Sequence, residues 1–230
     1  MIAIIDYGAG NLRSVAKAFE HLGYRALVTQ RREDMERAAA VVLPGVGAAG
    51  DTMRSLEALG LTGPIGQTIA AGRPFFGVCL GLQVLLEGSE EGGWQPCLGL
   101  IPGVVRRLPA DTAGRAAGAL RLKVPHMGWN QVRQRLSHPL FAGIPDNANF
   151  YFVHSYYVAP RDPVVVAGET EYGGAFCSVV IQERLVATQF HPEKSGAWGL
   201  RLYDNFARLA GLEPARDLTA ETQRAQSDAE

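Results

Sequence analysis

The residues best suited to covalent chemistry are a cysteine framed by glycines and a histidine followed by an acid. Cys79 occupies the centre of the segment Gly-Val-Cys-Leu-Gly at 77–81, between an apolar stretch at 74–78 and a helix-like run at 80–86. A strand, a sharp turn that carries the nucleophile and a helix together make a nucleophile elbow, and glycine avoids Cβ clashes in such a turn. The head of a helix favours a thiolate. This pattern predicts that Cys79 is a reactive nucleophile, although a lone buried cysteine is usually an inert small hydrophobe.

His191 is the candidate base. It follows the strand-like run at 185–190 and precedes Pro192 and Glu193. Because proline fixes its own φ and favours extended geometry in the residue before it, this segment can aim the imidazole and place the Glu193 carboxylate behind it. Such a carboxylate orients a catalytic imidazole and stabilises its charged form. Cysteine, histidine and glutamate would then supply nucleophile, base and orienter. A lone His-Pro-Glu can equally be a strand end beside a surface acid.

Acyl transfer also needs donors for an oxyanion. The backbone N–H of Leu80, which follows the nucleophile, is placed to be one, and the loop of Gly45, Val46 and Gly47 could supply another. The same loop could be a plain strand-to-helix turn, and no Lys-Ser/Thr follows it as in a phosphate-binding P-loop. Since glycines leave this loop free to change conformation, we expect its peptide not to be fully oriented as an oxyanion donor in the isolated chain.

The composition argues against several other classes of protein. The 230 residues are 47% hydrophobic, enough for one large core, and the net charge of −1 offers no basic excess for nucleic acid. No apolar run is long enough to span a bilayer, and the first residues do not resemble a signal peptide. The three cysteines lack the spacing of disulfides or of a zinc site. The sequence therefore favours a cytoplasmic protein that uses neither a metal nor a cofactor.

The first half of the chain alternates strand-like and helix-like segments. Strands are expected at 2–6, 25–29, 39–43 and 75–78, and helices at 11–22, 53–59 and 65–71, with Asn11 capping the first helix. Strands separated by helices of this length build a parallel sheet that is covered on both faces. The loops at Gly8, Pro44 and Cys79 would meet at its carboxyl edge, where the sites of such sheets lie.

The second half has a different texture, with short strand-like runs at 104–107, 120–124, 150–153, 164–167, 176–180 and 185–189, and a closing helix at 198–212. We therefore expect an α/β fold with a mostly parallel central sheet, flanking helices and an added antiparallel sheet. Residues 1–212 would form one domain, and the polar residues 213–230 a disordered tail. The Ala- and Gly-rich stretch at 110–119 would be a mobile surface loop.

Two widely separated motifs carry a family resemblance. GVCLG followed by Gln83, with FHPE near the C-terminus, resembles the class I (triad-type) glutamine amidotransferases over nearly the whole chain. Further segments resemble the glutaminase subunits of imidazole glycerol phosphate synthases, from histidine biosynthesis: IDYGAGNLRSV at 5–15, PGVGA at 44–48, PHMGWN at 125–130, YFVHSYY at 151–157 and QFHPEKSG at 189–196.

This resemblance implies a role for each matching residue. Cys79 would be the nucleophile that forms a γ-glutamyl thioester, His191 the general acid and base, and Glu193 its orienting residue. Matching positions also imply an oxyanion site at Gly45, Val46, Gly47 and Leu80, glutamine contacts at Gln83, Glu91, Ser155 and Tyr156, and a partner-facing set of Asn11, His126, Trp129, Tyr151 and Lys194. On residue type alone, Glu91 could be a solvated turn residue, and Trp129 either core or an interface anchor.

The resemblance also implies a partner. Ammonia released from glutamine would pass to a (β/α)₈-barrel cyclase subunit, which must be a separate protein because such a barrel alone needs about 250 residues. The two would form a heterodimer. Two alternatives stay open on the sequence: a class I subunit that feeds a different synthase, and a catalytically silent binding module on the same fold.

Overall fold

A computed structural model describes residues 1–109 and 122–215 of the chain. The expected loop at 110–119 lies outside these residues, as does the expected tail apart from its first three members. The last of these three is bonded to the domain, because the Ala215 N–H donates a hydrogen bond to the Gly23 carbonyl at 2.8 Å. Within the described ranges, no helix has both the length and the apolar character needed to cross a bilayer.

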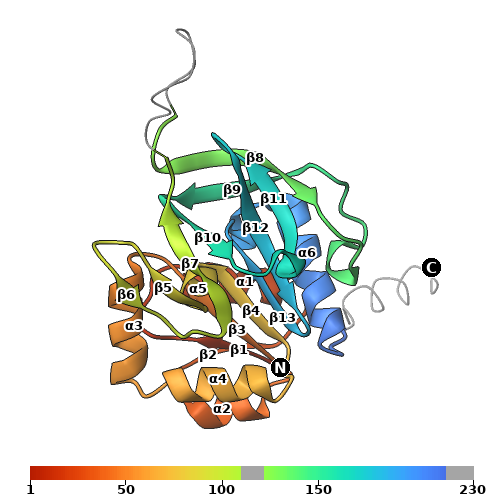
Figure 1. Cartoon of the computed structure of the whole chain (residues 1–230). Helices are drawn as coiled ribbons and strands as arrows, with labels where there is room; N and C mark the ends of the chain where they lie inside the picture. The colour runs from red at the N-terminus through yellow and green to blue at the C-terminus, as the bar shows by residue number, and fades with distance from the viewer. Residues whose placement is uncertain (110–121, 216–230) are drawn as a thin grey trace, which may run out of the picture.

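A five-stranded parallel sheet forms the centre of the fold (Figure 1). Its strands, in spatial order, are β2 (Ala26–Thr29), β1 (Ile2–Ile5), β3 (Ala40–Gly45), β4 (Phe75–Cys79) and β13 (Leu185–Thr188). All but the edge strand β2 are buried along their whole lengths. Continuous apolar runs such as Ile2–Ile5 predict this, because a strand covered on both faces has no solvent-facing positions.

Helices cover both faces of this sheet, as the strand–helix alternation predicts. On one face, Ile2 and Ile4 of β1 belong to the same apolar cluster as α1 (Leu12–His21) and α6 (Gly196–Leu209). On the other face, Ala3 and Ile5 belong to the cluster of α2 (Arg32–Arg37), α3 (Ala49–Ala58) and α4 (Thr62–Ala70). The predicted α/β architecture is confirmed, and the carboxyl ends of the parallel strands form one shared edge.

An antiparallel extension begins at β12 (Ala175–Gln182), which pairs with β13. From β12 the sheet continues through β10 (Tyr156–Pro160), β7 (Ile101–Arg107), β5 (Leu86–Ser89) and β6 (Gln95–Pro96). A branch from β12 runs through β11 (Val166–Glu171) and β8 (His126–Gln134) to β9 (Ala148–His154). Short 3₁₀ turns lie at Pro139–Phe141, Pro163–Val165 and Pro192–Lys194. The predicted antiparallel addition is confirmed.

Three expected strands differ from the observed ones. In the run at 164–167, Val164 and Val165 belong to a 3₁₀ turn and β11 begins only at Val166. The strand expected at 120–124 lies partly outside the described residues, and its last members, Lys123 and Val124, are not in a strand. The strand begins instead at His126, directly after Pro125, which has no N–H for a sheet ladder. The run at 185–189 forms β13, which pairs in parallel with β4 and so completes the central sheet on that side.

Two local predictions around helices are wrong. The helix after the nucleophile, α5, spans only Leu80–Gln83, because the chain turns and enters β5 at Leu86. Asn11 stands at the N-cap position of α1 but makes no side-chain cap bond; it has a positive φ of 77°, and its amide donates to Glu193 instead. A long-range carboxylate thus replaces the local backbone partner that a cap prediction assumes.

Candidate active site

The elbow at Cys79 has the strained geometry that its glycines predict. Cys79 adopts φ 54° and ψ −105°, which L residues rarely occupy. A Cβ added to Gly77 would lie 2.9 Å from the Gly81 carbonyl oxygen, and one added to Gly81 would lie 1.9 Å from the Leu43 carbonyl oxygen. The two glycines therefore let α5 fold back against the strands, and the turn lifts the thiol out of the sheet.

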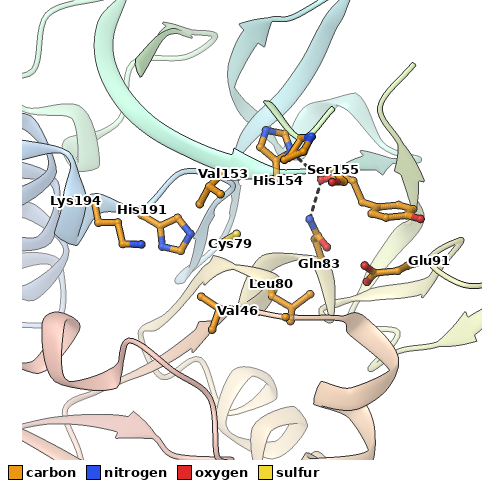
Figure 2. Close-up of a pocket in the computed structure, with 13 residues that line it drawn as sticks. Val46, Cys79, Leu80, Gln83, Glu91, Val153, His154, Ser155, His191 and Lys194 are labelled. Carbon is orange, nitrogen blue, oxygen red and sulfur yellow. Dashed lines mark hydrogen bonds between the residues drawn. The ribbon is translucent and has the colours of Figure 1, made fainter. Parts of the chain in front are cut away.

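Strand register brings the C-terminal motif beside the nucleophile. In the parallel pair of β4 and β13, Thr188 lies opposite Val78, so that Gln189 follows opposite Cys79. The Gln189 side chain confirms this proximity, because its Nε2 donates to the Cys79 Sγ at 3.7 Å. His191 comes two residues later, and Figure 2 shows its ring turned toward Cys79.

His191 and Glu193 form a buried dyad. The His191 Nδ1 lies 2.7 Å from the Glu193 Oε1, and neither side chain is exposed to solvent. The amide of Asn11 also donates to Oε1, and the Tyr203 hydroxyl donates to Oε2 at 3.2 Å. These donors compensate for burying the carboxylate and fix its orientation behind the imidazole.

The turn that follows His191 is fixed to the sheet. The His191 N–H donates to the Tyr151 carbonyl of β9 at 3.0 Å, and the Ser195 Oγ donates to the His191 carbonyl at 2.6 Å. Ser195 Oγ also accepts from the Tyr151 N–H at 3.0 Å. The backbone of Gly199 approaches the Pro192 carbonyl so closely that a Cβ there would lie 1.9 Å from its oxygen. The imidazole is thus held by contacts on both sides of the turn.

The electrostatics of this dyad favour a charged imidazole. Burial by itself lowers the pKa of His191, but hydrogen bonding and charge from Cys79 and Glu193 outweigh it and raise the pKa to about 10. The Nε2 atom has no hydrogen-bond partner of standard geometry within the described residues. The imidazole beside Cys79 is therefore charged at neutral pH.

The expected oxyanion residues lie around the same thiol. Val46, Gly47 and Leu80 line the cavity that contains Cys79. Gly45 ends β3 directly opposite Cys79 in the strand register, and a Cβ on Gly45 would lie 2.8 Å from the Leu80 Cβ. Glycine is required at 45 for this close packing, whereas Gly47 has a φ of 104° and nothing near its Cβ direction. The elbow and the glycine loop thus sit side by side at the carboxyl edge of the sheet.

The cavity has a volume of about 400 Å³ and contains every predicted substrate residue. Figure 2 shows it opening between Cys79 and His191 on one side and Gln83 and Glu91 on the other. Its walls are formed by Val46, Gly47, Cys79, Leu80, Gln83, Glu91, Pro125, Val153, His154, Ser155, Tyr156, His191 and Lys194. The floor is therefore supplied by the parallel sheet and the roof by β9 and the start of β10.

Two acceptors define the wall opposite the dyad. Glu91 accepts the N–H of Ala49, the first residue of α3, at 2.8 Å, so the carboxylate is tied to a helix N-terminus rather than solvated in a turn. The Gln83 Nε2 donates to the Tyr156 carbonyl at 2.8 Å and to the Gln189 Oε1 at 3.2 Å. These anchors leave carboxylate and amide oxygens available to a cationic ligand group.

The predicted partner-facing residues divide into two groups. Trp129 is 58% exposed and packs edge-on against Tyr151, over whose ring the Lys194 Nζ lies at 5.9 Å. His126 differs from the expectation, because it is only 3% exposed and stacks beneath Tyr172. Asn11 also turns inward, to Glu193. Trp129, Tyr151 and Lys194 therefore form a surface at the site, while the other two side chains support its interior.

Several site residues were missed in the sequence. Gln189 and His154 belong to the quoted motifs QFHPEKSG and YFVHSYY, yet nothing in their local spacing reveals contacts to Cys79 or to the cavity. Tyr7 is a third case: its hydroxyl is buried without a partner among the described residues, and burial raises its pKa to about 12. A Cβ on Gly45 would lie 2.8 Å from that hydroxyl, so Tyr7 supports the loop from beneath.

Comparison with known proteins decides the family. The sequence model described as "Glutamine amidotransferase class-I" matches residues 3–209. The chain belongs to this family. The resemblance expected from the elbow and the FHPE motif is thereby confirmed, and the protein is a glutamine amidotransferase.

Individual relatives show which members of the family this chain is similar to in sequence and fold. The chain is 51% identical over 210 residues to "Imidazole glycerol phosphate synthase subunit HisH" of Dehalococcoides mccartyi, covering 91% of this chain and 98% of that protein. It is 54% identical over 211 residues to the protein of the same name from Aromatoleum aromaticum, covering 91% and 98%. A "Crystal structure of glutamine amidotransferase" shares the fold, with a TM-score of 0.66, 21% identity, and coverage of 92% of this chain and 100% of that chain.

Proposed function

We propose that this chain is the glutaminase subunit of an imidazole glycerol phosphate synthase in histidine biosynthesis, with Cys79, His191 and Glu193 as its catalytic residues. The observation that carries the proposal is the placement of a buried histidine–glutamate dyad beside a cysteine on a strained elbow, in one cavity with Gln83 and Glu91. The identity of about half of all residues to subunits of that name supports the choice of synthase.

The first half-reaction forms a thioester. The Cys79 thiolate attacks the side-chain amide carbon of glutamine, and the C=O π electrons move to the oxygen. The N–H of Leu80 and the loop at 45–47 are the nearest backbone donors for this oxyanion. When the tetrahedral intermediate collapses, the C–N bond breaks and the His191 imidazolium gives its proton to the leaving amine. Ammonia departs and a γ-glutamyl thioester remains on Cys79.

The second half-reaction returns the enzyme to its starting state. His191, now neutral, takes a proton from water, whose oxygen attacks the thioester carbon. The C–S bond then breaks, glutamate leaves, and the thiolate again faces an imidazolium. The Glu193 carboxyl oxygen accepts a hydrogen bond from the Nδ1 of His191, so that Nε2 is the atom that exchanges protons with substrate.

The opposite wall suits the α-carbon end of glutamine. Glu91 and the Gln83 oxygen are acceptors for the α-ammonium group, since both are anchored with their free oxygens toward the cavity. Ser155 and Tyr156 follow β9 at the same wall and offer backbone and hydroxyl groups to the α-carboxylate. This division of acceptors and donors would favour an amino acid over a simple amide.

A separate cyclase subunit is the proposed recipient of the ammonia. Trp129 presents the large exposed aromatic surface that interface anchors use, and it stands against Tyr151 beside the cavity-lining Lys194. A (β/α)₈-barrel cyclase docked on this surface would receive ammonia directly from the site, as one half of a heterodimer. The free thiols of Cys79, Cys97 and Cys177 suit a reducing compartment, so we propose the cytoplasm as its location.

The Cys79→Ala variant tests the proposal in complex with the cyclase. It should abolish product formation from glutamine, by at least about 10³-fold, because no thioester can form. It should leave product formation from added ammonium salt within about twofold, since the cyclase chemistry does not use the thiol. Loss of both activities would give Cys79 a structural role instead. Stimulation by a different acceptor enzyme, and none by the cyclase, would assign the chain to another synthase.

A further inference from the structure

Two histidines outside the catalytic dyad are linked in a hydrogen-bond chain that ends at the glutamine site. The chain starts at Asn130 of β8, whose Nδ2 lies 3.2 Å from the His126 Nε2. The His126 Nδ1 lies 3.0 Å from the His154 Nε2, and the His154 Nδ1 lies 2.9 Å from the Tyr156 carbonyl oxygen. His126 and His154 are 3% and 6% exposed, so both rings are largely shielded from water.

The contacts of Asn130 determine which atoms donate and which accept in this series of hydrogen bonds. The Asn130 Nδ2 also donates to the Glu171 carbonyl at 3.0 Å, and its Oδ1 accepts the Gln131 N–H at 2.8 Å. Those two bonds fix the nitrogen as the atom that faces His126. Because an amide nitrogen only donates, the His126 Nε2 must be an unprotonated acceptor. The single proton of neutral His126 is then on Nδ1, from which it is donated to His154.

The contact between His154 and Tyr156, at the other end of the series, independently requires the same assignment of donors and acceptors. A carbonyl oxygen only accepts, so the His154 Nδ1 facing Tyr156 must carry a proton. Its Nε2 is then free to accept from His126. A second proton on either ring would set two N–H groups against each other, and burial lowers the pKa of His126 to about 4 and of His154 to about 3. Both rings are therefore neutral and protonated on Nδ1.

The Tyr156 carbonyl in turn fixes the orientation of the Gln83 side-chain amide. The Tyr156 carbonyl accepts from His154 and from the Gln83 Nε2, and the second proton of that nitrogen goes to the Gln189 Oε1. Both protons of the Gln83 amide are thus used inside the protein, and only its oxygen is left for a ligand. In Figure 2 this oxygen points away from the Tyr156 bond, toward the side on which Glu91 lies.

We infer that His126 and His154 are positioning residues for glutamine binding: as neutral Nδ1-protonated rings they hold the Tyr156 carbonyl, which keeps the Gln83 oxygen directed at the substrate ammonium. This inference rests on the proposed role of Gln83 as a glutamine contact. Without the His154 donor, the carbonyl can rotate and the Gln83 amide can turn its nitrogen into the cavity. A cationic ligand would then meet a donor instead of an acceptor.

A matched pair of variants tests this inference in complex with the cyclase. Asparagine at 154 can present a side-chain N–H near the position of the histidine Nδ1, whereas leucine has the same shape and no donor. His154→Leu should raise KM for glutamine about tenfold, while His154→Asn should stay within about threefold of the unmodified protein. Alkylation of Cys79 by iodoacetamide, which has no α-ammonium group, should change by less than about threefold in both variants.

The outcomes separate this inference from the proposed function. Equal KM values for His154→Leu and the unmodified protein, or equal increases in both variants, would overturn the positioning role. Gln83→Leu serves as the reference: if it leaves KM unchanged, the proposed substrate contact fails as well. Should His154→Leu not fold, nitrogen-15 NMR of the unmodified chain decides, because an Nε2-protonated or charged ring at His126 or His154 at neutral pH contradicts the inference.

Discussion

Glu193 shows how a charged group is kept inside this protein without solvent. Its two oxygens accept from His191, Asn11 and Tyr203, which lie in three separate parts of the sequence. A buried carboxylate needs several such donors, because the free-energy cost of removing its charge from water is large. The orientation of Glu193 therefore depends on the residue before α1 and on α6 as much as on the turn that carries it.

At the scale of single residues, the sequence indicated which residues belong to the candidate site better than it indicated which partners their side chains bind. Cys79, His191 and Glu193 could be found because a glycine-framed cysteine and a histidine fixed by proline carry local signals. Asn11 was misread as a helix cap, since a cap prediction considers only the neighbouring backbone and its real acceptor is Glu193. Gln189 gave no signal, because its function depends on strand register.

The histidine pair predicts a loss of stability in acid. In the unfolded chain an ordinary histidine has a pKa near 6.5, above the values of about 4 and about 3 for folded His126 and His154. Between these values the unfolded state binds more protons, so the free energy of unfolding falls as pH falls below 6.5. By pH 5 the loss from His154 should be on the order of 1–2 kcal/mol, measured by urea denaturation.

The His154→Asn variant isolates this effect, because asparagine does not titrate. Its stability should decline less between pH 7 and pH 5 than that of the unmodified protein. His21→Asn is the matched control, since His21 is exposed at the end of α1 and its replacement should leave the pH dependence unchanged. Identical slopes for the His154→Asn variant and the unmodified protein would show that His154 is not buried as a neutral ring.

At the scale of elements, backbone approach rather than side-chain chemistry shapes the elbow. Gly77, Gly81 and Gly45 all pack where a Cβ would come within 3 Å of another atom. The sequence predicted the close packing of the first two from their spacing around Cys79. The pairing of β4 with β13 was not predictable in the same way, because a short apolar run such as 185–188 carries no information on the direction of its neighbour.

Gly81→Ala tests the close packing of the elbow. Its new methyl group would lie 1.9 Å from the Leu43 carbonyl oxygen in the absence of movement, so backbone must shift. We expect a loss of unfolding free energy on the order of 3 kcal/mol in chemical denaturation. Gly63→Ala in α4 is the control, because nothing lies within 4 Å of its Cβ position. A loss below about 0.5 kcal/mol for Gly81→Ala would mean that the elbow tolerates a side chain.

At the scale of the whole molecule, the cavity lies where the parallel part of the sheet meets its antiparallel extension. The parallel sheet supplies Cys79, β9 supplies Val153 and His154 of the roof, and β8, which pairs with β9, carries the exposed Trp129. A partner on this surface would touch the same strands that hold His154 and the Tyr151 contact to His191. The proposed cyclase contact and the proposed chemistry are thus separated by a single layer of structure.

This arrangement predicts that the isolated chain is a slow glutaminase. Gly47 has a φ of 104° and nothing lies within 4 Å of its Cβ direction, so neither a side chain nor a close neighbour at that position restricts the peptide between Val46 and Gly47. Binding of the cyclase and its ligand should order that loop and raise glutamine turnover roughly 10–100-fold, measured as glutamate release. Equal turnover with and without the cyclase would show that the oxyanion donors are already in place.

The order of strands in the sheet has a consequence for how the protein is synthesised and folded. β13 lies between β4 and β12, although it comes last in sequence among the strands of the described residues. The elbow at Cys79 is therefore synthesised well before His191, and the two side chains come together only after β13 has paired with β4. On the proposed mechanism, a polypeptide that ends before β13 has no base for Cys79 and cannot hydrolyse glutamine, because pairing of the last central strand and assembly of the proposed triad are the same event.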